Sequence, residues 1–202
     1  MGRELKRIEI CGGIASGKTT LARLLRRAGL IPIHENFRKN PFYLAFYRDP
    51  IGTAFETEIT FLLQHYHEEK KIISHHGIFC LDFSLVLDHA YACVTLSTRD
   101  LRLFRTILER AEAHLPRRSL LVHLTCPPQV ELQRIRARRR DAERAITIEY
   151  LKNLNNALQA RIKKLPRSEN VLVVDSGNMD FAHRQEAKTD VMRQIKEALG
   201  AK

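Results

Sequence analysis

Residues 12–19 read Gly12-Gly13-Ile14-Ala15-Ser16-Gly17-Lys18-Thr19, which satisfies the full phosphate-loop pattern G-x-x-x-x-G-K-T. The preceding residues 7–11 alternate and are β-branched like a strand, and residues 20–27 have helical periodicity. This strand, loop and helix are the context that the pattern requires. A glycine turn before an ordinary helix would not need Lys followed by Thr at these two places. The sequence therefore predicts a nucleoside triphosphate site here.

Each part of the loop has a predicted task. The glycines let backbone N–H groups surround phosphate oxygens, and the helix N-terminus adds the positive end of its dipole. Lys18 is expected to reach the β- and γ-phosphates, and the Thr19 hydroxyl to ligate Mg²⁺. The predicted ATP-binding set in this loop is Gly12, Gly13, Ile14, Ala15, Ser16, Gly17, Lys18, Thr19 and Thr20.

Composition indicates one α/β domain, residues 1–202, because a chain with 44% hydrophobic and 28% charged residues can bury one sizeable core. The N-terminus is polar and does not resemble a secretory signal. No apolar run approaches the roughly 18 residues needed to cross a bilayer. We expect a cytoplasmic protein with no membrane partner. Its four cysteines show no C-x-x-C pairing, which is typical of reduced structural thiols.

More than a third of the net charge of +11 lies in one short segment. Residues 134–144 contain six arginines, two acids and no aromatic residue. Nucleic-acid surfaces usually interleave aromatic side chains with basic ones, so a phosphate clamp is favoured and no nucleic-acid partner is expected. The alternative is an exposed basic helix with Asp141 and Glu143 as its ionic partners.

Five short apolar segments separated by helical stretches predict the fold class: an α/β, P-loop NTPase-type parallel sheet with helices on both faces. Ligands in such folds gather at the carboxyl ends of the strands. The predicted strands are Arg7–Cys11, Leu30–His34, Gly77–Leu81, Ser119–Leu124 and Val171–Val174.

Two acids follow predicted strands. Glu35 follows the second strand and begins a loop of little periodicity, where it could accept a proton from an attacking hydroxyl; the alternative is a surface acid. Asp82 follows the third strand, where it could support Mg²⁺ or merely cap the helix that begins at Ser84.

A long helix is predicted from Thr53 to about Ser74. Glu56 and Leu63 lie seven residues apart, share one face of it, and could both contact a ligand; most helix glutamates are instead solvated. The apolar run from Leu85 to Leu96 is expected to pack against another helix or another subunit.

Taken together, several segments resemble the deoxynucleoside kinase family, P-loop enzymes that phosphorylate deoxynucleosides at the 5′-hydroxyl. The resemblance runs from about residue 7 to residue 185, and the order of its segments makes chance similarity improbable. The segments are G-G-I-A-S-G-K-T-T (12–20), E-N-F-R-K-N-P-F (35–42), F-Y-R-D-P (46–50), A-F-E-T-E-I-T-F-L-L (54–63), L-D-F-S with Asp88 (81–88), and T-C-P-P through E-Y-L (125–151).

The resemblance implies ATP as phosphate donor, Mg²⁺ as metal, a deoxynucleoside as substrate, and a homodimer formed through the Leu85–Leu96 run. It implies that Glu35 is the general base. Arg134, Arg138 and Arg140 match arginines of a lid, about residues 134–144, that closes over the transferred phosphate.

It also implies the remaining contacts. Tyr47 and Glu143 would contact the sugar 3′-hydroxyl, and Asp88 with Leu63 would line the nucleobase pocket. Asp180-Phe181 matches the loop that borders the ATP adenine.

Two departures from the family pattern stand out. Phe83 follows Asp82 where the family usually has arginine. This removes a guanidinium near the general base. Glu56 is assigned to the position of a glutamine that bonds the nucleobase. Because an ionised carboxylate only accepts hydrogen bonds, it would suit the two adjacent donors of guanine. This predicts a purine preference, with deoxyguanosine ahead of thymidine.

Two other functions remain open at this point. One is a kinase for a nucleotide or another small hydroxyl metabolite. The other is a nucleotide-binding protein in which Phe83 marks weakened catalysis, although a mere binder needs neither a base nor aligned arginines.

Overall fold

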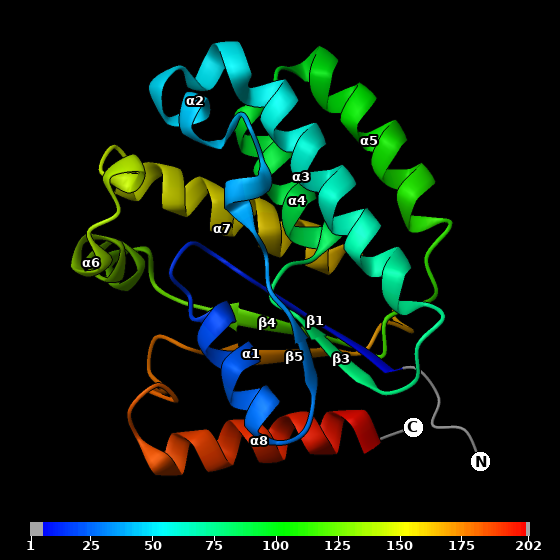
Figure 1. Ribbon diagram of the computed structural model, residues 1–202. Coiled ribbons are helices and arrows are strands. Elements are labelled where there is room, and N and C mark those ends of the chain that lie inside the picture. Colours follow the sequence, from blue (N-terminus) through cyan, green and yellow to red (C-terminus); the bar gives the residue numbers. More distant parts are fainter. Residues whose placement is uncertain (1–5, 201–202) are drawn as a thin grey trace.

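Parallel strands form the centre of the protein in a computed structural model that describes residues 6–200 (Figure 1). Within these residues the sheet has five strands in the order β2-β3-β1-β4-β5. The predicted α/β fold is confirmed, and no strand end lies more than one residue from its predicted position. The strands are β1 (Lys6–Gly12), β2 (Ile31–Ile33), β3 (Ile78–Leu81), β4 (Leu120–Thr125) and β5 (Val171–Asp175).

The strand order determines where ligands can bind. β1 is central, and its Ile8 lies beside Cys80 of β3 and Leu120 of β4. Ile8 and Ile10 are fully buried because both faces of the sheet are covered. Because β2, β3 and β1 are neighbours and parallel, the segments that follow them meet at one edge.

Two helices cover one face of the sheet: α1 (Lys18–Arg27) and α8 (Gln185–Gly200), which lie below it in Figure 1. Leu21 and Leu25 of α1 share a core with Val191 of α8 and with the sheet. The apolar positions recur at three- and four-residue steps, which is why these segments fold as amphipathic helices.

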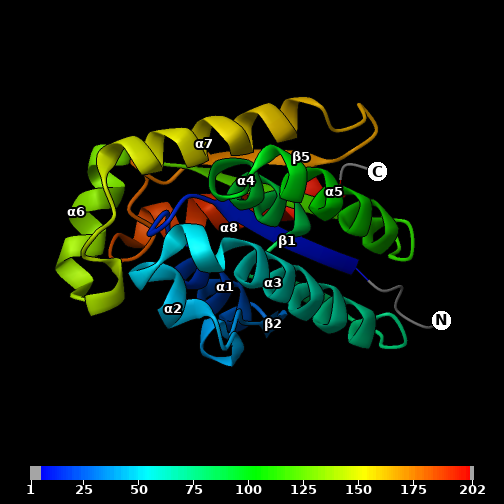
Figure 2. The same cartoon turned by 90° about the horizontal axis from the view of Figure 1, so that it is seen from above.

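The opposite face is covered by a thicker helical layer, seen from above in Figure 2. It consists of α3 (Pro50–Ile72), α4 (Leu85–Thr95), α5 (Thr98–Glu112) and α7 (Ile148–Lys163). α4 contacts α7, α3 and α5. The apolar run predicted there therefore packs against helices of its own chain.

The loop predicted after the second strand is partly helical. It contains a 3₁₀ turn (Phe37–Lys39) and the short helix α2 (Tyr43–Arg48). α3 begins at Pro50, earlier than predicted, because proline suits the first helical turn. Asp49 caps α3 by accepting a hydrogen bond from the Gly52 N–H at 3.0 Å.

Two further elements lie between β4 and α7 in the chain: α6 (Pro128–Arg138) and a 3₁₀ turn (Asp141–Glu143). No helix among residues 6–200 is long and apolar enough to cross a membrane. The four cysteines are free, as predicted.

Candidate active site

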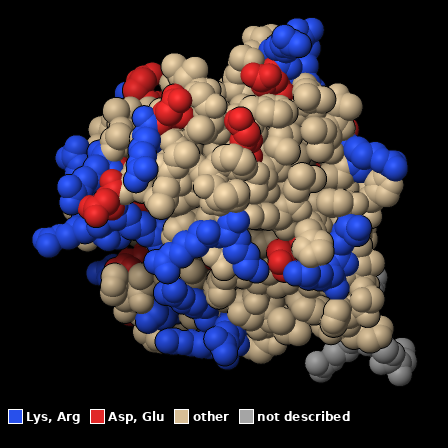
Figure 3. Space-filling view, turned by 45° about the horizontal axis from the view of Figure 1, so that its top comes forward, with Lys and Arg blue, Asp and Glu red and all other residues tan. Residues whose placement is uncertain are grey.

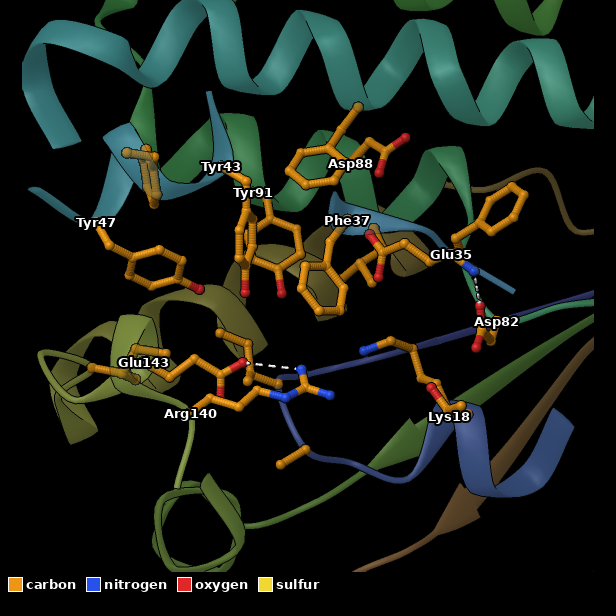
Figure 4. A pocket seen from close by; sticks show the side chains of 18 of the residues that line it. Lys18, Glu35, Phe37, Tyr43, Tyr47, Asp82, Asp88, Tyr91, Arg140 and Glu143 are labelled. Carbon is orange, nitrogen blue, oxygen red and sulfur yellow. Dashed lines mark hydrogen bonds and ion pairs between the residues drawn. The ribbon is translucent and has the colours of Figure 1, made fainter. Parts of the chain in front are cut away.

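A cavity of about 1020 Å³ opens at the carboxyl ends of β1, β2 and β3. Figure 4 shows side chains from both halves of the chain pointing into it. The phosphate loop and α1 form one wall, and α3 with α4 forms the opposite wall. Residues of α6, the 3₁₀ turn after it and the start of α7 close the remaining side.

The phosphate loop has the geometry expected of an anion cradle. Gly17 caps α1 with a φ of 104°, in the left-handed region that favours glycine. Gly13 has no room for a side chain, since an added Cβ would lie 2.0 Å from Oε1 of the buried Glu131. Among the predicted ATP-binding residues, those lining the cavity are Ile14, Ala15, Gly17, Lys18, Thr19 and Thr20.

Lys18 is folded back onto the loop. Its Nζ donates to the carbonyl oxygens of Gly12 at 2.9 Å and Gly13 at 3.0 Å. Burial lowers the pKa of Lys18, although the nearby carboxylates of Glu35, Asp82 and Glu131 oppose this effect. A triphosphate would place further negative charge beside this half-buried ammonium.

Glu35 lies across the cavity from Lys18. Its carboxylate forms an ion pair with His65, with Nε2 and Oε1 3.5 Å apart, and about a third of its side chain is exposed. Burial raises the pKa of Glu35, but the contact with His65 and the charges of Lys18 and Arg140 outweigh it and hold the pKa below its usual value. Glu35 is therefore an ionised carboxylate in a cavity, as a proton acceptor must be.

Asp82 lies between the phosphate loop and Glu35. Its Oδ2 pairs with His34 Nδ1 at 2.9 Å, and its Oδ1 accepts from the Glu35 backbone N–H at 2.5 Å (Figure 4). The helix-capping alternative is wrong, because Ser84 caps α4 by accepting from the Leu87 N–H. The buried Asp82 lines the cavity together with Thr19, so both stay candidates for Mg²⁺.

The three predicted arginines all line the cavity. Arg134 donates to the carbonyl oxygen of Ser176 at 2.8 Å. Arg138 and Arg140 both bind Glu143, at 2.6 Å and 3.3 Å, and Arg140 lies over the Phe37 ring at 5.1 Å.

Basic side chains also gather outside the cavity. Figure 3 shows them at the left and lower centre of one face, on the side where α6 lies in Figure 1. Arg139 caps the C-terminus of α6, and its φ of 51° turns the chain so that Arg140 points back into the cavity.

The predicted sugar contacts lie together. Tyr47 lines the cavity beside Tyr43, with ring centroids 5.3 Å apart. Glu143 is only 3% exposed and lines the same region. Burial raises the pKa of Tyr47, so its hydroxyl keeps its proton and can donate.

Two predicted nucleobase contacts are wrong. Glu56 is exposed and Leu63 is 50% exposed, and neither lines the cavity. They do share a helix face, but it is the solvent face of α3. The face directed to the cavity carries Thr57, Glu58, Phe61 and His65.

Glu58 and His65 were missed by the sequence reasoning. Both are polar residues on α3 at a spacing of seven, and both are buried, at 4% and 5% exposure. Glu58 accepts a hydrogen bond from Thr95 at 2.9 Å. Burial, with a contribution from Asp88, raises the pKa of Glu58 to about 8 against the opposing effects of Thr95 and His65. One sequence signal points to them: the apolar Leu62 lies four residues after Glu58 and three before His65, so the three share one side of the helix. In the structure Leu62 is fully buried, which makes this the inner side.

The residues of the predicted adenine loop lie outside the lining of the cavity. Phe181 is buried in the core, and its ring lies against Gly17 of the phosphate loop. Asp180 pairs with His183 at 3.1 Å. Neither residue lines the cavity, so their contact with adenine stays a prediction.

Comparisons with known proteins point to one family. The family described as "Deoxynucleoside kinase" matches residues 8–200. A deoxyadenosine kinase of Dictyostelium discoideum is 30% identical over 166 residues, covering 79% of this chain and 68% of that protein. A deoxyguanosine kinase of Bacillus subtilis is 27% identical over 200 residues, covering 95% and 97%.

A solved structure shares the fold. The deoxyadenosine kinase from M. mycoides with bound dCTP superposes with a TM-score of 0.81 at 21% identity. The alignment covers 95% of this chain and 99% of that one.

Proposed function

The chain belongs to the deoxynucleoside kinase family, and we propose that it transfers the γ-phosphoryl group of ATP to the 5′-hydroxyl of a purine deoxynucleoside. The observation that carries this proposal is the position of ionised Glu35 in one cavity with Lys18 and three arginines. A binder of ATP alone needs no carboxylate opposite its phosphate loop.

In the proposed reaction the Glu35 carboxylate takes the proton of the 5′-hydroxyl as its oxygen bonds to the γ-phosphorus. The bond from that phosphorus to the bridging oxygen breaks, and ADP leaves. Lys18, Arg134 and Arg138 would stabilise the charge that spreads over the transferred phosphoryl group. Arg140 would join them by leaving Glu143, whose Oε1 lies 3.3 Å from the Arg140 guanidinium.

The donor set also fits Mg²⁺. The Thr19 hydroxyl and the Asp82 carboxylate are hard oxygen ligands that line the same cavity. Residues 6–200 contain no group of three or more His, Cys, Asp or Glu side chains that could hold a metal ion. Such a site suits an ion bound largely through nucleotide phosphates, whose charge it would neutralise.

We propose that Glu58, rather than Glu56, determines the purine preference. Glu58 is the acid that faces the cavity, beside Asp88 and Phe61. With a pKa of about 8 it is mainly a neutral acid at pH 7, offering one donor and one acceptor, as adenine requires. Its ionised form would instead accept from the two donors of guanine. Relatives named deoxyadenosine kinase and deoxyguanosine kinase support the preference.

The decisive experiment replaces Glu35 by glutamine. We expect Glu35→Gln to lower phosphorylation by about 10²- to 10⁴-fold while ATP binding stays intact, because the amide cannot accept the proton. Glu186→Gln, an exposed change on α8, is the matched control and should keep full activity. ADP release would be measured with each of the four deoxynucleosides. Full activity of Glu35→Gln, or no turnover with any deoxynucleoside, would refute the proposal.

A homodimer stays a prediction from the family resemblance, because α4 is already covered by helices of its own chain. Sedimentation velocity at several protein concentrations would test it, and a monomer at all of them would contradict it.

A further inference from the structure

One buried residue joins two carboxylates in the cavity wall. His65 of α3 is 5% exposed. Its Nδ1 lies 2.9 Å from Oδ2 of Asp88 on α4, and its Nε2 lies 3.5 Å from Oε1 of Glu35 after β2. The three side chains therefore form a chain that runs from the core to the reacting end of the cavity.

Phe83 packs against the central residue of this chain, His65. Its ring is stacked on the His65 ring, with centroids 4.2 Å apart and planes 10° from parallel. Phe83 is only 2% exposed, so its position is fixed by the core. The face of an aromatic ring attracts a cation, and this attraction is stronger when water is excluded.

The charges around His65 favour its protonated form. Asp88 faces it from α4, Glu35 from the end of β2, and Glu58 from α3 itself, while the neighbour after β3 is the uncharged Phe83. Burial lowers the pKa of His65, but Asp88 and Glu35 outweigh it and raise the pKa to about 10. The two flanking carboxylates thus favour the imidazolium form of the ring at neutral pH.

We propose that His65 is a positioning residue: a fixed cation, anchored by Asp88 and stacked on Phe83, that holds the Glu35 carboxylate in its productive orientation. This inference rests on the proposed function, in which Glu35 accepts the proton. It also accounts for a phenylalanine near the proton acceptor Glu35, since Phe83 supplies the surface on which His65 stacks. The competing role for the same pair is direct contact with the nucleobase.

Kinetics separate these two roles. We expect His65→Gln to lower kcat by about 10- to 100-fold with little change in KM, because a displaced reacting group costs rate more than affinity. Without the cation, burial raises the pKa of Glu35, so the acid limb of the kcat profile moves to higher pH. His65→Arg, which restores a planar cation, should recover part of the rate. His67→Gln, on the exposed side of α3, is the matched control.

A direct measurement does not depend on any variant. Long-range ¹H–¹⁵N spectra of the ligand-free wild-type protein should show the His65 ring doubly protonated from pH 6 to pH 8. A neutral ring at pH 7 would overturn the proposal. So would a His65→Gln protein with wild-type kcat and acid limb, or one in which only KM and nucleoside ranking change. Failure of the proposed function is distinguishable, because Glu35→Gln would then be fully active or the wild type would phosphorylate no deoxynucleoside.

Discussion

The two ends of the cavity are built in different ways. The donor end is one continuous loop, residues 12–20, in which backbone groups and Lys18 do most of the expected binding. The acceptor end is assembled from the ends of β2 and β3, one face of α3, and α4. A contiguous loop can be recognised from its letters alone, whereas an assembled wall depends on how distant segments turn toward one another.

The largest effect expected at the donor end tests whether this end serves every substrate alike. Lys18→Met should lower kcat/KM by about 10²- to 10³-fold, because a buried cation that stabilises transferred charge is lost. The factor should be the same for all four deoxynucleosides, since Lys18 lies opposite the acceptor wall. Arg26→Met, exposed on the same helix, is the control. Loss of activity with only one nucleoside would contradict this division of labour.

The same division explains what the sequence could and could not predict. The phosphate loop, the five strands and Glu35 were located because each depends on local pattern and on strand order. Glu56 is assigned from the family resemblance to the position of the nucleobase-binding glutamine. Its seven-residue spacing from Leu63 predicts a shared helix face but does not say which face turns inward. His65 carried no motif, and its importance comes from Asp88 and Glu35, which lie 23 and 30 residues away in sequence.

A stability measurement tests whether the donor end depends on its backbone. In Gly12→Ala the new Cβ would lie 2.7 Å from the carbonyl oxygen of Leu124 on β4, which cannot move without disturbing the sheet. We expect the free energy of unfolding to fall by about 1–3 kcal/mol. Gly200→Ala meets nothing within 4 Å and should be neutral or slightly stabilising. Equal stability of the two variants in urea unfolding would show that the loop can relax.

The acceptor end should make specificity depend on pH. Because the pKa of Glu58 is about 8, its neutral acid predominates below pH 8 and suits adenine, and its carboxylate predominates above and suits guanine. The ratio of kcat/KM for deoxyadenosine over deoxyguanosine should therefore fall, by about tenfold, between pH 6.5 and 8.5.

Glu58→Gln should abolish this pH dependence, because glutamine offers one donor and one acceptor at every pH. Glu56→Gln, two residues earlier on the solvent face, should leave the ratio unchanged. If Glu56→Gln changed the ratio and Glu58→Gln did not, the phase assigned to α3 would be wrong.

The smallest effect probes the stacking surface in the acceptor wall. Phe83→Leu keeps an apolar side chain but removes the ring face beneath His65, so kcat should fall by roughly two- to fivefold, as expected for about 0.5–1 kcal/mol of cation–π attraction. Phe79→Leu is the matched change, because Phe79 is buried in the same small core cluster without lining the cavity. Both variants lose similar core packing, and both should lose comparable stability. Only Phe83→Leu should lower the pKa of His65 in the ¹H–¹⁵N titration, since only that ring stabilises the imidazolium.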